Sequence, residues 1–199
     1  MNNATKTSHR PLRLAIIGGG PASWIGGQHR RAAQLDGCWQ VVAGVFSSHP
    51  ERAASAAQAV GVDPARGYVD VATMLAAEAQ RADGIEAVAI MTPNDTHYPY
   101  AAAALDAGLD VIGDKPVSTT AAEARDLAVR ARAKDRIFCV THGYSAYPMT
   151  RYAKQLVADG VIGPVRFVQV EYIQSGLAKP IEQGTMTDSQ RWKFDAERS

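Results

Sequence analysis

Residues 12–26 read LRLAIIGGGPASWIG: a largely apolar run is followed by three glycines and then by the start of a predicted helix. The run from Leu12 to Ile17 predicts a buried strand that ends in a tight turn. Residues 25–35 predict a helix, which Gly37 can end. A strand, a glycine turn and a helix in this order predict an α/β unit whose helix N-terminus faces the turn.

Such a turn holds a pyrophosphate in dinucleotide-binding folds, because glycine lets the backbone approach closely and the helix amides attract negative charge. Gly18 and Gly20 occupy the first two positions of that fingerprint. Ser23 stands where a third Gly or Ala is usual, and Gly26 can supply the close helix contact one turn later. A purely structural turn is the alternative. The other candidate cofactor-binding residues of this turn are Pro21, Ala22, Trp24 and Ile25.

The rest of the chain repeats the alternation of strand and helix. Strands are predicted at 39–46, 85–91, 110–112 and 137–140, and helices at 50–60, 70–80, 96–107 and from Thr120, where Glu123 gives capping-box spacing. Strands that are apolar on both faces and alternate with helices predict an α/β fold, a Rossmann doubly wound parallel sheet, over residues 10–145.

The pattern changes after residue 145. Residues 149–159 predict a helix, and 165–173 (VRFVQVEYI) alternate apolar and polar side chains, as an antiparallel strand with one wet face does. We therefore expect residues 146–199 to begin an α/β second domain with an antiparallel sheet, truncated before that sheet is complete. Its apolar face is expected to be exposed or irregularly buried.

Composition narrows the class of protein. The formal net charge of +1 gives no reason to expect nucleic acid or an anionic membrane as partner. Residues 1–11 contain no apolar run, and no apolar stretch approaches the ~20 residues that span a bilayer, so we expect a soluble, cytoplasmic protein. Cys38 and Cys139 show no metal-ligand spacing, which predicts two reduced core thiols and no metal site.

The end of the second predicted strand bears on the dinucleotide. NAD sites usually place an acid there, to bind the ribose 2′-hydroxyl. Here Ser47 and Ser48 follow the strand, and the first acid is Glu51. Without a carboxylate to repel it, a 2′-phosphate can be bound by these serines and Arg52, which favours NADP, although serines also tolerate NAD.

A lysine follows the strand at 110–112, in the sequence Asp114-Lys115-Pro116. The carboxyl end of a parallel strand is where α/β folds bind ligands. Partial desolvation beside a substrate favours the neutral amine, which can take a proton from a hydroxyl group. A surface lysine in a strand-ending turn is an equally good interpretation of the spacing alone.

Taken together, four motifs in this order resemble the glucose–fructose oxidoreductase and inositol dehydrogenase family, often written Gfo/Idh/MocA. They are the glycine turn, Thr92-Pro93-Asn94 followed by His97, Asp114-Lys115-Pro116, and the Gly160-Val161-Ile162-Gly163 turn. The resemblance runs from about Leu12 to the end of the chain. It implies hydride transfer, with NAD or NADP, to or from a hydroxyl or carbonyl carbon of a sugar, cyclitol or related polyol. It also implies a homo-oligomer when the protein is full length.

The resemblance assigns roles to residues. Asp114-Lys115-Pro116 matches the family's Glu-Lys-Pro motif, which makes Lys115 the catalytic proton-transfer residue and places Asp114, Lys115 and Pro116 beside the cofactor. Thr92, Pro93 and Asn94 match the loop that passes the nicotinamide end, and His97 either joins that site or only packs against its helix. His142 and Tyr144 match a segment bordering the substrate pocket, where a structural role for His142 is an equal alternative.

The family's remaining catalytic groups, an aspartate and a histidine on a helix of the second domain, are expected after Ser199. The chain is therefore expected to bind its cofactor without completing the active site. A dinucleotide-binding protein without dehydrogenase activity, such as a sensor or a partner subunit, is the alternative function. A nucleotide-binding domain unrelated to redox chemistry is disfavoured, since it needs a phosphate-loop lysine and the sequence has no Gly-Lys-Ser/Thr.

Overall fold

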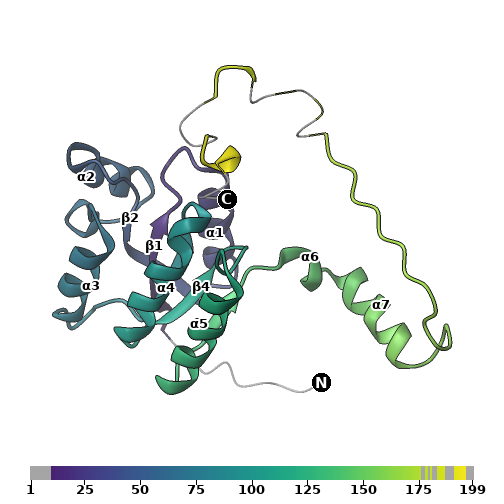
Figure 1. The fold of residues 1–199 in the computed structure, drawn as a ribbon. Helices are drawn as coiled ribbons and strands as arrows, with labels where there is room; N and C mark the ends of the chain where they lie inside the picture. The colour runs from purple at the N-terminus through teal and green to yellow at the C-terminus, as the bar shows by residue number, and fades with distance from the viewer. Residues whose placement is uncertain (1–9, 176–177, 179, 181–182, 187–190, 196–199) are drawn as a thin grey trace. The chain divides into compact units, whose positions relative to one another are not determined.

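The computed structural model describes residues 10–175, 178, 180, 183–186 and 191–195 (Figure 1). The polar segment 1–9, part of the predicted N-terminal tail, lies outside the described residues. The chain divides into two compact units, Met1–Val140 and Thr141–Ser199. Each unit is described by itself.

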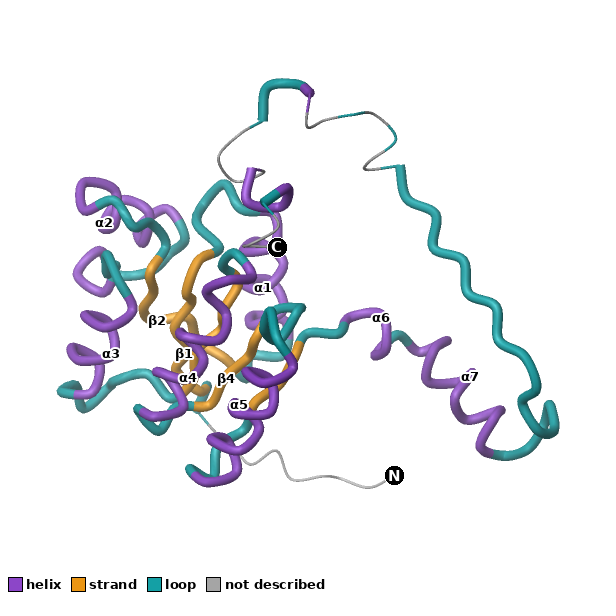
Figure 2. Tube along the Cα trace, viewed as in Figure 1, coloured by secondary structure: helices purple, strands orange, loops and turns teal. Residues whose placement is uncertain are grey.

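The first unit is built on a parallel sheet. Its strands are β1 (Leu12–Gly18), β2 (Trp39–Val45), β3 (Ala87–Met91), β4 (Asp110–Gly113) and β5 (Phe138–Val140). Their order is β2-β1-β3-β4-β5, and every neighbouring pair is parallel. Figure 2 shows the strands in orange, with helices around them. This confirms the predicted α/β class and the parallel sheet.

Helices connect the strands. They are α1 (Trp24–Leu35), α2 (Pro50–Ala59), α3 (Val71–Ala79), α4 (His97–Asp106) and α5 (Ala121–Ala133), with single 3-10 turns at Pro64–Arg66 and Asn94–Thr96. The helix starts have local causes. Ser23 and Asp70 cap α1 and α3, and the predicted capping box of Thr120 and Glu123 starts α5.

Both faces of the sheet are covered, because alternate residues of each strand point to opposite sides. On one face, Leu14 and Ile16 of β1 pack in a buried cluster with residues of α1 and α2. On the other face, Ala15 and Ile17 pack with residues of α3, α4 and α5. This two-sided burial explains why the strands are apolar throughout rather than alternating.

One further segment lies along β2. Gly67 forms a single parallel bridge with Gly44, and the amide of Tyr68 donates to the Gly44 carbonyl at 2.8 Å. With this bridge in the place of a third strand, the sheet has the strand order of a dinucleotide-binding Rossmann fold. The order reverses between β1 and β3, where doubly wound sheets hold their ligands.

A buried ion pair fixes the bridging segment to α3. Arg66 is 6% exposed and Glu78 2%. The Nε of Arg66 donates to Glu78 at 3.0 Å, and the Tyr68 hydroxyl donates to the same carboxylate at 2.8 Å. Arg66 also donates to the backbone carbonyl of Asp83, at 3.2 Å. The pKa of Tyr68 is raised to about 12, mainly by burial and to a smaller extent by the hydrogen bond to Glu78.

The second unit contains α6 (Gly143–Ala146) and α7 (Pro148–Ala158), and the predicted turn at 160–163 follows α7 with Gly160 and Gly163 in left-handed backbone. The predicted strand at 165–173 is wrong for this structure, since these residues form no strand. A strand needs a partner for its backbone groups, and the described part of the chain places none beside it. The expected exposure is confirmed: Phe167, Val170 and Ile173 are 80%, 83% and 91% exposed.

The prediction of two core thiols is also wrong. Cys38 and Cys139 are both free, as expected, but both are exposed. Cys38 lies in the turn before β2, and Cys139 lies on β5, at the end of the strand order, where one side has no neighbouring strand among the described residues. An apolar run therefore did not place either cysteine in the core.

Candidate functional site

The candidate site lies at the point where the strand order reverses. The last residue of β1, Gly18, is in register with Met91, the last residue of β3. The chain leaves β1 through Gly18 and Gly19, whose φ angles are +85° and +57°. Residues with a side chain rarely adopt this backbone, so the turn depends on glycine.

Two further glycines are required by close approach. A Cβ on Gly20 would lie 2.6 Å from the carbonyl oxygen of Phe46, at the end of β2. A Cβ on Gly26 would lie 2.6 Å from the Cα of Gly19, so α1 packs directly on the glycine turn. Gly26 thus makes the close contact that the sequence suggested, one turn after the usual third position. Ser23 instead caps α1, its hydroxyl accepting from the Gly26 amide at 3.1 Å.

The turn fits a pyrophosphate on these observations. Glycines in left-handed backbone form the turn, and α1 packs on it too closely for a Cβ. Backbone without side chains therefore lies at the N-terminus of α1, the arrangement that binds phosphate through amide groups. Pro21, Ala22 and Trp24 are exposed around it, while Ile25 is half-buried. Gly18 and Gly20 are themselves half-buried, so the turn is partly open to solvent.

Arg30 contacts the glycine turn, a role that the sequence did not predict. Its guanidinium, on α1, donates to the carbonyl of Gly19. Burial lowers the pKa of Arg30. His29, the preceding residue, is half-buried, which lowers its pKa, and the carboxylate of Asp114 acts in the opposite direction to a smaller extent. The spacing of Gly26, His29 and Arg30 along one helix face was the available signal.

The segment after β2 leads into α2, whose first turn carries an ion pair. The Ser47 hydroxyl accepts from the His49 amide at 3.2 Å, and Ser48 is exposed. The Nε of Arg52 lies 3.5 Å from a carboxylate oxygen of Glu51. A hydrogen bond from its own backbone amide, at the start of α2, lowers the pKa of Glu51. The cation proposed for a 2′-phosphate thus has a carboxylate beside it.

The loop after β3 is held by side chains of its own segment. The Thr96 hydroxyl donates to the carbonyl of Pro93 at 2.6 Å and lies 2.7 Å from the Thr92 hydroxyl. Thr92, Pro93 and Asn94 are half-buried and follow the strand directly. His97 is 3% exposed and lies beneath this loop.

The loop after β4 holds the candidate lysine. The Asp114 amide donates to the Ile90 carbonyl at 2.9 Å, and the Asp114 carboxylate accepts from the Lys115 amide at 2.9 Å. The Lys115–Pro116 peptide bond is cis. The Lys115 side chain is exposed, at the same sheet edge as the glycine turn.

The structure therefore brings together four predicted segments. The turns after β1, β2, β3 and β4 all leave the carboxyl edge of neighbouring parallel strands. His142 and Tyr144 belong to the second unit, where both are exposed, and the Tyr144 hydroxyl lies 2.7 Å from that of Tyr172. This hydrogen bond raises the pKa of Tyr144.

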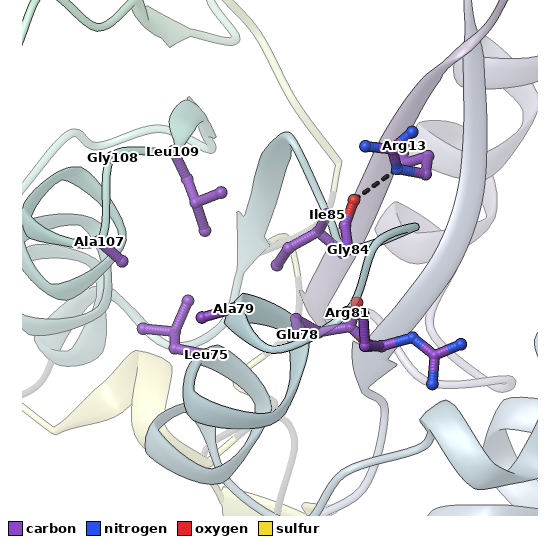
Figure 3. Close-up of a pocket in the computed structure, with 10 residues that line it drawn as sticks. All are labelled: Arg13, Leu75, Glu78, Ala79, Arg81, Gly84, Ile85, Ala107, Gly108 and Leu109. Atoms are coloured by element: carbon purple, nitrogen blue, oxygen red, sulfur yellow. Dashed lines mark hydrogen bonds between the residues drawn. The ribbon is translucent and has the colours of Figure 1, made fainter.

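A surface pocket lies at the opposite edge of the sheet (Figure 3). Its volume is about 360 Å³, and its lining includes Arg13 near the start of β1, Ile85 just before β3 and Leu109 just before β4. These are amino ends of parallel strands, so this pocket is separate from the candidate site. Arg13 donates there to the Gly84 carbonyl.

Comparison with known proteins agrees with this geometry. Residues 12–142 match the model of the Gfo/Idh/MocA family, described as an oxidoreductase family with an NAD-binding Rossmann fold. The chain belongs to this family. The resemblance expected from the four motifs is confirmed. As a Gfo/Idh/MocA chain, it carries the NAD-binding Rossmann fold of an oxidoreductase family.

Individual relatives extend the match beyond the Rossmann unit. The uncharacterized oxidoreductase YfiI of Bacillus subtilis is 38% identical over 98% of this chain and 50% of its own length. An inositol dehydrogenase homolog of Azotobacter vinelandii with NAD+ gives a TM-score of 0.90 at 38% identity, covering 98% of this chain and 50% of that one. A structure of such a homolog with NADH and myo-inositol gives 0.77 at 43% identity, covering 79% and 41%. This Gfo/Idh/MocA chain thus spans about half the length of these proteins.

No helix in the described ranges is long and apolar enough to cross a membrane.

Proposed function

We propose that this chain binds a nicotinamide dinucleotide and serves the oxidation or reduction of a hydroxyl or carbonyl carbon in a polyol or sugar-like substrate. One observation carries the proposal: the glycine turn, the β2 end, the Thr92 loop and the Lys115 turn share one sheet edge. The myo-inositol of the Azotobacter homolog supports the substrate class.

Different residues would bind the dinucleotide and transfer the proton. The backbone of Gly18 and Gly20, with the N-terminus of α1, would hold the pyrophosphate, and Thr92 with its loop would border the nicotinamide end. The bound dinucleotide supplies the hydride chemistry. The Nζ of Lys115 accepts the hydroxyl proton during oxidation and returns it during reduction.

Dinucleotide binding is tested by titrating the chain with NADH and with NADPH, following energy transfer from tryptophan to the reduced nicotinamide. Saturable binding of either one supports the proposal. Absence of binding for both at millimolar concentration overturns it. The relative affinities assign the dinucleotide that the serine-rich β2 end prefers.

The role of Lys115 is tested by substituting it with methionine. Lys134, an exposed lysine after α5 at the other end of the sheet, provides the matched control. With oxidised dinucleotide and myo-inositol or other polyols, Lys115→Met should abolish formation of reduced nicotinamide and change NADH affinity far less, and Lys134→Met should change neither. Turnover is measured within a protein of the relatives' length, of which this chain spans about half, and dinucleotide binding without turnover there would favour a sensor or partner subunit instead.

We also propose that the full-length protein is a homo-oligomer. The exposed apolar side chains of residues 165–173 support this, because a large exposed apolar surface usually marks an interface. Light scattering of the full-length protein tests it, and a monomer at every accessible concentration would contradict it.

A further inference from the structure

A buried histidine joins the two loops that frame the candidate site. The Nε2 of His97 lies 2.9 Å from the carbonyl oxygen of Thr92, in the loop after β3. Its Nδ1 lies 2.6 Å from the carbonyl oxygen of Pro116, in the turn after β4. One side chain thus contacts both the loop expected to border the nicotinamide and the turn that carries Lys115.

The contacts do not belong to helix capping. His97 is the first residue of α4, but its ring nitrogens reach carbonyl oxygens five residues earlier and nineteen residues later, not the amides of its own helix. A carbonyl oxygen only accepts, so the neutral imidazole, with one N–H, donates to one of the two carbonyl oxygens and lies in contact with the other, and only the imidazolium donates to both. With 3% of its surface exposed, the ring is itself held in place.

We propose that His97 is a positioning residue: its imidazole fixes the separation between the Thr92 loop and the Lys115 turn. This inference rests on the proposed function, because it matters where nicotinamide and Lys115 must meet. The planar ring sets the two carbonyl oxygens at a fixed spacing across β3 and β4. His97 therefore acts through Thr92 and Pro116 and does not itself touch the cofactor.

Two substitutions separate the two contacts and show which of them carries the hydrogen bond. The side-chain amide of His97→Asn can replace Nδ1 toward Pro116 and leaves Thr92 without a donor. The longer amide of His97→Gln can replace Nε2 toward Thr92 and leaves Pro116 without one. Tyr98→Phe is the matched control, since it removes a 3.0 Å hydrogen bond to Asp126 from the neighbouring position of α4 and touches neither loop.

The measurement compares NADH with ADP-ribose, which lacks the nicotinamide, in equilibrium titrations of the chain, with melting temperature recorded for each variant. His97→Asn should weaken NADH about five- to tenfold, as expected for one lost hydrogen bond, and change ADP-ribose less than about twofold. His97→Gln should keep most of the NADH affinity, and Tyr98→Phe should leave the ratio of the two affinities unchanged.

Two results would overturn the inference. If His97→Asn weakens NADH and ADP-ribose equally, in step with a lower melting temperature, the histidine only stabilises the fold. If neither affinity changes, the bond to Thr92 does not position the loop. A wild-type chain that binds neither probe would instead refute the proposed function, and the inference would fall with it.

Discussion

Adding one methyl group to α1 at two neighbouring positions should have opposite effects. At Gly26, the new Cβ would lie 2.6 Å from the Cα of Gly19, whereas ordinary contact begins at 3.4 Å. The carbonyl oxygen of Gly19 lies closer still, so the helix must retreat by more than about 0.8 Å, and overpacking of this kind costs ~1–3 kcal/mol. At Gly27 nothing lies within 4 Å of the new Cβ.

Both substitutions gain ~1 kcal/mol of helix propensity, so their difference isolates the contact with the glycine turn. We expect Gly27→Ala to stabilise the chain by ~0.5–1 kcal/mol and Gly26→Ala to destabilise it by up to ~2 kcal/mol. Gly26→Ala should also weaken NADH at least about tenfold, because the helix N-terminus moves away from the pyrophosphate.

Urea unfolding followed by circular dichroism gives the free energies, provided the slope of the transition is the same for both variants. The tryptophan energy-transfer titration gives the NADH affinity. Equal stability of Gly26→Ala and Gly27→Ala would refute the packing argument. A destabilised Gly26→Ala that binds NADH as tightly as the wild type would separate the contact from the cofactor site.

Three further perturbations test the electrostatics. Glu78→Ala should cost up to ~3–5 kcal/mol in urea unfolding, because it leaves the buried Arg66 cation with only the more exposed Asp83 carboxylate, 3.3 Å away, and replacing Arg66 and Glu78 together with apolar residues should restore much of the loss; a cost under ~1 kcal/mol would contradict the burial. The hydrogen bonds from Arg10 lower the pKa of Glu86 from 4.5 to about 2, so this stabilisation is present above pH 4.5 and is lost as the pH falls toward 2. The stability difference between wild type and Glu86→Gln should therefore shrink over that range, and a constant difference would argue against the ion pair. Glu51→Gln removes the carboxylate beside the proposed 2′-phosphate position, so the affinity for NADPH relative to NADH should rise about three- to tenfold in parallel titrations, and an unchanged ratio would place the phosphate elsewhere.

The alternation of apolar runs with capped helices was sufficient to predict the sheet and most element ends. Thr120 and Glu123 start α5 by a local hydrogen-bond exchange, which depends on residues three apart and not on the tertiary structure. The strand predicted at 165–173 is wrong because a strand, unlike a helix cap, depends on the tertiary structure. Alternating side chains make a strand only where another strand satisfies the backbone, and a sequence pattern does not show whether that partner is present.

For the candidate site, the sequence by itself determined the chemistry available: a glycine turn between strand and helix, a lysine after a strand, and serines in place of an acid. These are local features, fixed by backbone freedom and by position along a strand. Only the tertiary structure decided which of them meet. Gly26 packs on Gly19, and His97 spans two loops, because parallel strands bring distant turns to one edge. Contacts across that edge depend on register and packing, which no single segment encodes.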